Sequence, residues 1–318
     1  MGLAEGPVAP ASQALMIVES TPRRRGFNMG FIQAVSSGVF GQVVGPALIV
    51  PLAVAVGWRT SFFLAGLPGL LLAVVLWFKV REPALKRFHE LHEAMSRGAG
   101  GVDPRLRRNV ALCIVVACLF ITTFFCVMVF GPLYLVEQRK FTNGQMALFM
   151  IVLGLSAVVG GILVPMLSDR WGRRPTVVLA LLLTSGAPLT IGVLPGDMVT
   201  LCGAIFVSYL GVGCLSIVVA TIPAESVDGA KASRTIGLVI GASEVVGGSI
   251  SPLVTGLAAD RIAPVAPFII GSACAFAAAV VALFLAESAP MRLHGRLAGA
   301  QPSPINSPRT STSSVYPS

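Results

Sequence analysis

Long apolar runs, separated by short polar breaks, extend along most of the chain. Nine such runs occur, at 2–20, 27–56, 60–78, 110–134, 144–167, 176–194, 199–222, 236–258 and 263–286. A membrane-spanning strand needs only about 9–11 residues, whereas a helix needs about 20 to cross the hydrocarbon core. Because the runs have the length that a helix needs, the pattern predicts an all-α, polytopic membrane helical bundle.

The composition supports a chain embedded in a lipid bilayer. Hydrophobic residues make up 55% of the 318 residues and charged residues only 12%, with a mean hydropathy of +0.84. Soluble domains carry about 25% charged residues. The net charge of +9 does not indicate a nucleic-acid partner, because the basic residues fall mainly between apolar runs. In such loops, basic residues orient a membrane protein.

The basic residues are divided unevenly between the two sets of loops. The segments after the first, third, fifth, seventh and ninth runs hold 19 of the 23 Lys and Arg residues, and the opposite loops hold 4. Cytoplasmic loops of membrane proteins carry such an excess. We therefore expect a multi-pass protein of the cell (inner) membrane, with its carboxyl terminus in the cytoplasm and its amino terminus outside.

An internal repeat relates the first three runs to the last three at an offset of 206 residues. The pairs that carry it are Glu19-Ser20 with Glu225-Ser226, Pro46 with Pro252, and Phe62 with Phe268. The middle three runs, within 108–206, have no upstream counterpart. Parallel repeats of this kind build transporters of two halves. We therefore expect three spans to be missing ahead of Met1.

The loop between the runs 144–167 and 176–194 carries a dense charge cluster. Its sequence is Leu167-Ser168-Asp169-Arg170-Trp171-Gly172-Arg173-Arg174. Charges are costly in hydrocarbon, so the loop must lie at a membrane face, and its basic excess predicts the cytoplasmic one. Gly172 permits a tight turn, and Asp169 can pair with a neighbouring helix end or an arginine.

This loop resembles the charged loop motif of the major facilitator superfamily of transporters, in its second-half position. The resemblance extends over 2–287 and implies the major facilitator fold with about nine of twelve helices present. It implies a gating role for the loop, although a simple topology anchor is the alternative. The residues concerned are Asp169, Arg170, Gly172, Arg173 and Arg174. The family usually has glycine where Pro165 stands, so we expect looser helix contact there.

The resemblance also divides the chain into four parts. Residues 1–78 are expected to be a remnant of the N-terminal transporter bundle, with three spans, and 79–109 a cytoplasmic linker. Residues 110–287 are expected to form the C-terminal six-helix bundle. The remaining segment, 288–318, has no acidic residue and is rich in Ser, Pro and Thr, which predicts a disordered cytoplasmic tail.

The first residues point to one branch of this superfamily. The stretch Gly2-Leu3-Ala4-Glu5-Gly6-Pro7-Val8-Ala9-Pro10-Ala11 resembles the fourth helix of the anion:cation symporter family. The resemblance implies that Glu5 couples transport to protons. A carboxylate in a low-dielectric cavity tends towards its neutral form, so it can exchange protons near neutral pH. The branch's anion-binding arginines are expected in regions that precede Met1.

Further candidates lie within the spans. Glu244 lies deep inside an apolar run, and ionisable groups there are functional candidates, either as proton sites or as structural hydrogen-bonding groups. Gly41-x-x-x-Gly45-Pro46 permits close packing and bending of helices and is similar to part of the family's antiporter motif. Residues that could line a substrate cavity, or bridge helices instead, are Gln13, Asn28, Gln33, Gln42, Tyr209 and Ser216.

Together these features predict a secondary active transporter for the proton-coupled uptake of a small organic anion. The alternatives are a drug/proton antiporter and a non-transporting polytopic protein derived from a transporter. No catalytic residues, metal ligands or cofactor are indicated, which argues against an enzyme. The six cysteines lie inside apolar runs without Cys-x-x-Cys spacing, which predicts free thiols.

Overall fold

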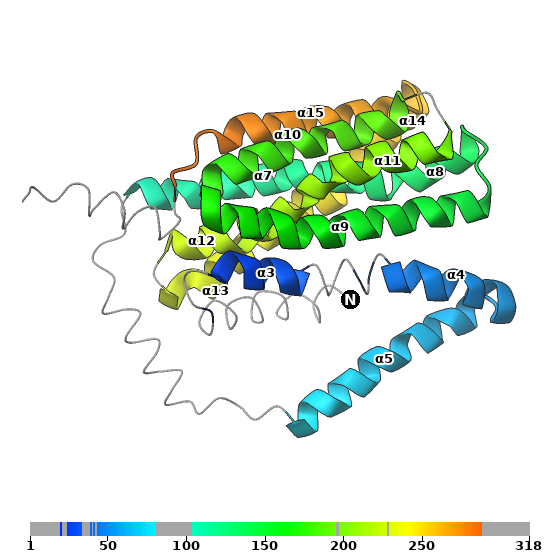
Figure 1. The fold of residues 1–318 in the computed structure, drawn as a ribbon, viewed down its shortest axis with the longest axis horizontal. Coiled ribbons are helices and arrows are strands. Elements are labelled where there is room, and N and C mark those ends of the chain that lie inside the picture. The colour runs from blue at the N-terminus through cyan, green and yellow to red at the C-terminus, as the bar shows by residue number, and fades with distance from the viewer. Residues whose placement is uncertain are drawn as a thin grey trace, which may run out of the picture.

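The computed structural model describes residues 20, 24–33, 39, 41, 43–79, 104–194, 197–227 and 229–287. Every regular element in this part of the chain is helical, and most of the helices lie side by side in one elongated bundle (Figure 1). The all-α prediction is therefore confirmed. The first predicted run, 2–20, lies outside the described residues apart from Ser20, as do the tail 288–318 and most of the linker.

Six helical passes form the bundle between residues 104 and 282. The first consists of α7 (Pro104–Met128) and α8 (Phe130–Glu137), followed by α9 (Asn143–Trp171) and α10 (Arg173–Gly192). The fourth pass joins α11 (Met198–Tyr209), η2 (Leu210–Cys214), η3 (Ile217–Thr221) and α12 (Ile222–Glu225). The fifth joins α13 (Gly229–Ser243), η4 (Glu244–Ile250) and α14 (Ser251–Arg261), and α15 (Ala266–Ala282) is the last.

A helix reaches back into the carboxyl end of the predicted linker. α7 begins at Pro104, inside the segment 79–109 that the sequence assigned to the linker. Proline is favoured in the first helical turn, where its missing N–H would have no partner. The charged residues that follow Pro104 lie ahead of the apolar run 110–134, so the sequence did not include them in the span. A helix nevertheless continues beyond hydrocarbon into water wherever its backbone hydrogen bonds can continue.

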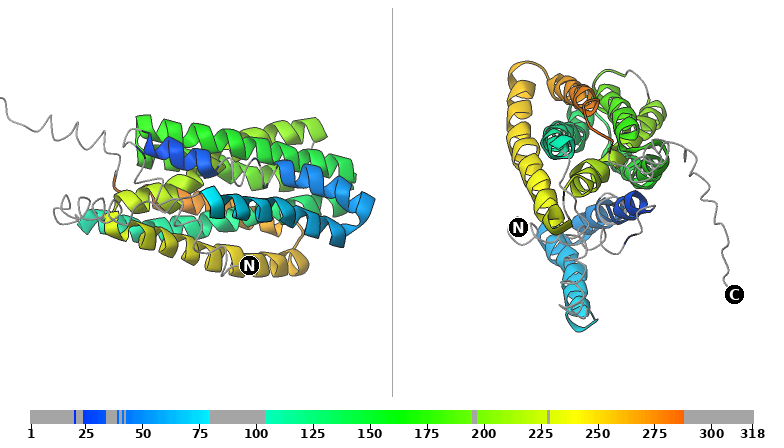
Figure 2. Two further views of the ribbon diagram at one scale, coloured as in Figure 1. Left: turned by 90° about the horizontal axis from the view of Figure 1, so that it is seen from below. Right: turned by 90° about the vertical axis from the view of Figure 1, so that its left-hand side faces the viewer.

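The N-terminal part consists of α3 (Arg25–Gln33), α4 (Gly45–Val56) and α5 (Trp58–Lys79). α3 packs against α9, and α4 also contacts α9, while α5 pairs with α4 in a hairpin and projects away from the bundle (Figures 1 and 2). Gly57, with φ of 84° and ψ of 152°, makes the turn between them. That backbone region is open almost only to glycine. Six helices in the described part of the chain are long and apolar enough to cross a membrane, so the protein is a multi-pass membrane protein.

Glycines bring three helical segments of the bundle into backbone contact. A Cβ at Gly213 would overlap the carbonyl oxygen of Gly160 in α9, and one at Gly211 would overlap that of Ala180 in α10. Small residues allow this approach, which lets dispersion contacts hold helices together in lipid. η2 is therefore held between α9 and α10.

Candidate functional site

Arg173, the first residue of α10, lies at the centre of a buried ionic cluster. Its side chain is 1% exposed, and each of its three guanidinium nitrogens donates a hydrogen bond. Nε donates to Glu225 Oε2 at 3.3 Å and Nη2 to Glu225 Oε1 at 2.9 Å, in a bidentate pair. Nη1 donates to Asp169 Oδ1 and to Ser168 Oγ. Because a buried charge is costly unless paired and hydrogen-bonded, these partners are what allow Arg173 to be buried.

The second oxygen of Asp169 reaches the N-terminal part of the chain. Oδ2 accepts the backbone N–H of Phe27, in the first turn of α3, at 3.0 Å. The first N–H groups of a helix have no partner within it and carry partial positive charge, so a carboxylate there is favourable. Asp169 thus makes both contacts that its position in the motif suggested, one to a helix end and one to an arginine.

The turn between α9 and α10 consists of Gly172 alone, with φ of 103° and ψ of 158°. Glu287 lies over this turn, with Oε1 accepting the N–H of Arg173 at 2.8 Å and Oε2 that of Arg174 at 3.3 Å. A Cβ on residue 172 would lie 2.6 Å from Glu287 Oε2. Gly172 is therefore required both by its backbone angles and by the carboxylate above it.

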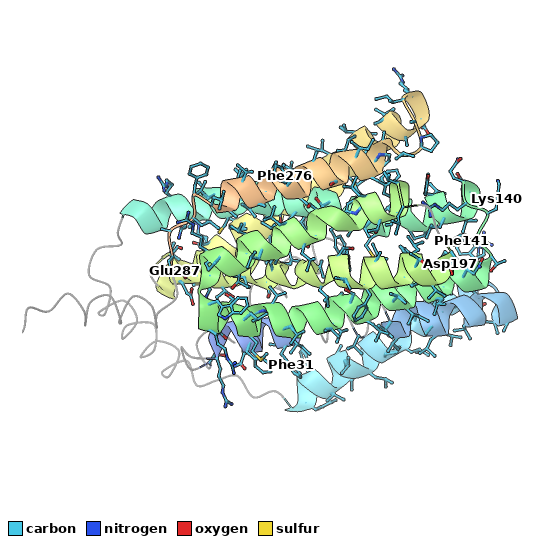
Figure 3. All side chains as sticks on the ribbon, turned by 45° about the horizontal axis from the view of Figure 1, so that its top comes forward. Phe31, Lys140, Phe141, Asp197, Phe276 and Glu287 are labelled. Atoms are coloured by element: carbon cyan, nitrogen blue, oxygen red, sulfur yellow. The ribbon has the colours of Figure 1, made fainter. Side chains whose placement is uncertain are left out.

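The other two arginines of the loop lie outside the cluster. Arg170 and Arg174 are exposed, and Trp171 between them is 51% exposed. Glu287 marks this end of the bundle in Figure 3, whereas Lys140 and Asp197 lie at the opposite end. The loop motif therefore has one buried arginine within the charge cluster and two arginines facing outward.

α3 approaches α9 closely, contrary to the looser contact that Pro165 suggested. A Cβ at Gly30 would overlap the carbonyl oxygen of Gly161 and the ring of Pro165. The space that a glycine at 165 would have provided on α9 is provided by Gly30 on α3 instead. The expectation was wrong because it considered only one of the two packed surfaces.

Glu244 lies within the fifth pass, where a π-helical segment begins. Its side chain folds along its own helix, since a Cβ at Gly248 would lie 2.7 Å from Glu244 Oε2. The same position is 3.3 Å from the ring of Phe125 in α7. Single π turns inside helices occur frequently at functional sites. Gly248 thus leaves room for a carboxylate beside an aromatic ring in the membrane-spanning region.

The remaining sequence candidates have varied surroundings. Asn28 donates from Nδ2 to Ser20 Oγ at 2.8 Å. Tyr209 and Ser216 are 0% and 2% exposed, so a role in contacting substrate requires another conformation and stays a prediction. Gly45 begins α4, with Pro46 in its first turn. Glu5, Gln13, Gln42 and the side chain of Gln33 lie outside the described residues, while Gly41 is exposed.

Glu225, Glu287 and Ser168 belong to the cluster but were not among the sequence candidates. Each lies near the end of an apolar run that terminates at the same membrane face as the loop. That shared position was the available signal. It was insufficient, because helix ends at one face can be far apart, and only packing shows which of them meet.

These contacts connect the loop motif to both parts of the chain, and a comparison with known families agrees with the motif. The sequence model of the Major Facilitator Superfamily matches residues 1–243 and again 155–312. The chain belongs to the major facilitator superfamily. This family consists of membrane transporters rather than enzymes, as the motif indicated.

Three curated relatives show the range of solutes within this superfamily. A probable sulfoacetate transporter of Cupriavidus necator is 25% identical over 90% of this chain and 70% of its own length. A probable 4-methylmuconolactone transporter of Cupriavidus pinatubonensis is 24% identical over 56% of the chain and 42% of its own length. An MFS-type efflux pump of Mycolicibacterium smegmatis is 25% identical, with coverages of 82% and 62%. The chain thus spans less than two thirds of two of these relatives.

Proposed function

We propose that the protein is a secondary active transporter for the proton-coupled uptake of a small organic anion. The observation that carries the proposal is the cluster of Asp169, Arg173 and Glu225, which binds α3 to the C-terminal bundle at one end. Major facilitator transporters work by rocking two bundles around a midplane site. Contacts that join the two parts at one face therefore determine when that face is closed.

The cluster has the properties of a gate. In the described part of the chain, the cluster reaches α3 through the charge-assisted hydrogen bond from the Phe27 N–H to Asp169, and such a bond at a helix end is worth roughly 0.3–2 kcal/mol. Its internal pairs all lie within the C-terminal bundle, so Arg173 keeps both carboxylates when α3 departs. Opening therefore breaks the weak link and keeps the buried charge neutralised. The exposed Arg170 and Arg174, with their positive charge, support assigning this face to the cytoplasm.

Glu244 is the proposed proton site among the described residues, and Glu5 is proposed from its motif. The carboxylate of Glu244 and the ring of Phe125 both lie near the Cβ position of Gly248, within a membrane-spanning pass, where ionisable groups are functional candidates. A group of this kind can bind a proton from one side and release it to the other. The organic anion is inferred from the names of the sulfoacetate and 4-methylmuconolactone relatives and from the resemblance of residues 2–11 to anion symporters.

Uptake of labelled sulfoacetate by bacterial cells that express the chain tests this proposal. We expect saturable uptake that collapses when a protonophore abolishes the proton gradient, and a roughly tenfold lower uptake rate in Asp169→Asn. Asp260→Asn, which removes an exposed carboxylate from the end of α14, serves as the matched control. Uptake that persists unchanged with the protonophore would contradict proton coupling.

Drug/proton antiport is the second candidate, supported by the efflux pump among the relatives and by the Gly41–Pro46 motif. Cells that express the chain can distinguish antiport from anion uptake. Export of a cationic dye that depends on Glu244, without uptake of anions, would favour antiport. No transport of either class would favour a non-transporting protein derived from a transporter.

A further inference from the structure

We propose that Asn109 and Glu287 are positioning residues of the gate, which they join through a segment that we call the strap, residues 284–287. The strap follows α15 and crosses to the starts of α7 and α10. The inference rests on the proposed gating function, and it adds two residues outside the loop motif. Its physical basis is that Arg173 is held from two sides, by its side chain and by its backbone.

The first observation is the anchoring of the strap by Asn109. This side chain is 0% exposed, and its amide pairs with both backbone groups of one residue. Nδ2 donates to the carbonyl oxygen of Ala286 at 3.0 Å, and Oδ1 accepts the N–H of Ala286 at 2.8 Å. Arg108 donates to the carbonyl oxygen of Phe284 at 3.2 Å, and Leu285 between these contacts is 1% exposed. The strap thus has a fixed position against α7.

The second observation is where this anchoring places Glu287. Its carboxylate accepts the N–H groups of Arg173 and Arg174, the first two of α10. A carboxylate at a helix N-terminus satisfies donors that have no partner in the helix and interacts favourably with the helix dipole. Glu287 therefore holds the backbone of the same residue whose guanidinium reaches Asp169 and Glu225.

The third observation links Asn109 to the other carboxylate of the gate. Nδ2 of Asn109 also lies 3.5 Å from Ser226 Oγ, and Ser226 directly follows Glu225. One buried amide therefore touches both the strap and the turn that carries Glu225. If the strap is released, Arg173 keeps its two carboxylate partners but loses the support that directs it towards α3 through Asp169.

Distances between spin labels at R24C and R170C, on either side of the gate, test the inference in lipid nanodiscs. Both positions are exposed, and the background would replace the six native cysteines by alanine. We expect Glu287→Gln to raise the ratio of open to closed populations about two- to fivefold, the effect of removing a charge from a helix N-terminus. Asn109→Ala should shift the ratio in the same direction, because it releases the strap that carries Glu287. We expect Glu287→Asp, which keeps the charge, to restore the closed population in part.

Two controls separate positioning from general stability. Leu201→Ala opens a cavity in α11, which starts at the opposite end of the bundle, so it should lower the melting temperature without moving the label distances. Glu137→Gln removes an exposed carboxylate from the end of α8 and should change neither quantity. A purely structural role for Glu287 would make Glu287→Gln behave like Leu201→Ala.

The outcomes also separate the strap from the gate. If Asp169→Asn opens the labelled pair and Glu287→Gln does not, the strap has no positioning role and the gate stands. If Asp169→Asn leaves the distances unchanged, the gate itself is refuted. If both variants open the pair, we expect the double variant to open it no further than Asp169→Asn alone, because both act on one contact. Additive effects would overturn the inference.

Discussion

The carboxylate of Asp169 accepts the backbone N–H of Phe27, a residue 142 positions earlier in the chain, at 3.0 Å. This bond joins the end of α9 to the start of α3, and hence the C-terminal bundle to the N-terminal part. It is also the part of the charge cluster that can break without leaving Arg173 unpaired. The loop motif identifies Asp169, but its role in joining the two parts of the chain depends on the backbone N–H of Phe27, which no motif specifies.

Replacing Asp169 by asparagine should weaken this junction selectively. The amide oxygen can still accept from Phe27, but the attraction to the N-terminus of α3 and to Arg173 is lost. We expect transport to fall about tenfold, which corresponds to about 1.4 kcal/mol. Initial uptake rates measure this effect. Unchanged rates, at equal amounts of protein in the membrane, would argue that the bond has no part in the transport cycle.

Arg173 and Glu225 should behave as a coupled pair. Arg173→Ala takes the guanidinium away from Glu225, and Glu225→Ala leaves Arg173 with Asp169 as its ionic partner; removing one partner of a buried pair costs about 3–5 kcal/mol. The double variant should cost less than the sum of the two, because no unpaired charge from this pair remains. Thermal unfolding in detergent measures the three values. Arg174→Ala, at an exposed position of the same turn, is the control and should lie within about 0.5 kcal/mol of the parent.

Gly172→Ala should destabilise the protein through its backbone and through Glu287. The φ and ψ angles at 172 cost about 1–3 kcal/mol for a residue with a side chain. The added Cβ also meets Glu287 Oε2 at 2.6 Å. Adding Glu287→Ala to the Gly172→Ala variant should relieve the destabilisation that comes from the steric clash, and leave the part that comes from the backbone angles. Gly203→Ala is the contrast, because nothing lies within 4 Å of a Cβ there, inside α11, and alanine should stabilise that helix by up to about 1 kcal/mol.

Gly30→Ala should separate α3 from α9 without altering any charge. Its methyl group would overlap Gly161 and Pro165, so α3 must move outward and lengthen the bond from Phe27 to Asp169. The label distance between positions 24 and 170 should therefore increase as it does in Asp169→Asn. Gly66→Ala in α5, where a Cβ meets nothing within 4 Å, should leave the distance as it was.

Substituting either proposed proton-binding carboxylate should affect gradient-driven uptake and counterflow exchange differently. Glu5→Gln and Glu244→Gln each remove a proton exchange, so we expect both to abolish uptake driven by a proton gradient. Counterflow exchange of substrate should persist, because it needs no net proton movement. If either variant keeps the pH dependence of the parent, that residue is not a coupling site.

Much of this fold could be predicted from sequence because the membrane imposes strict rules. In hydrocarbon every backbone polar group must be satisfied within the segment, so run length alone identified the C-terminal helices. The start of α7 at Pro104 was missed because apolar pattern ends where charge begins, whereas helix geometry continues into water. The tight contact at Pro165 was missed because its space comes from Gly30 on another helix.

The sequence by itself determined the class of protein: the apolar runs, the uneven loop charge and the Asp169–Arg174 motif led to a multi-pass transporter family, and the family match confirmed it. Tertiary structure alone decided which charges meet. Glu225 and Glu287 are 52 and 114 residues from Arg173, and loop composition cannot distinguish them from other acids at helix ends. The reason is physical. Hydrophobicity is a local property that a sequence displays directly, whereas the pairing of a buried charge depends on which helix ends packing brings within hydrogen-bonding distance.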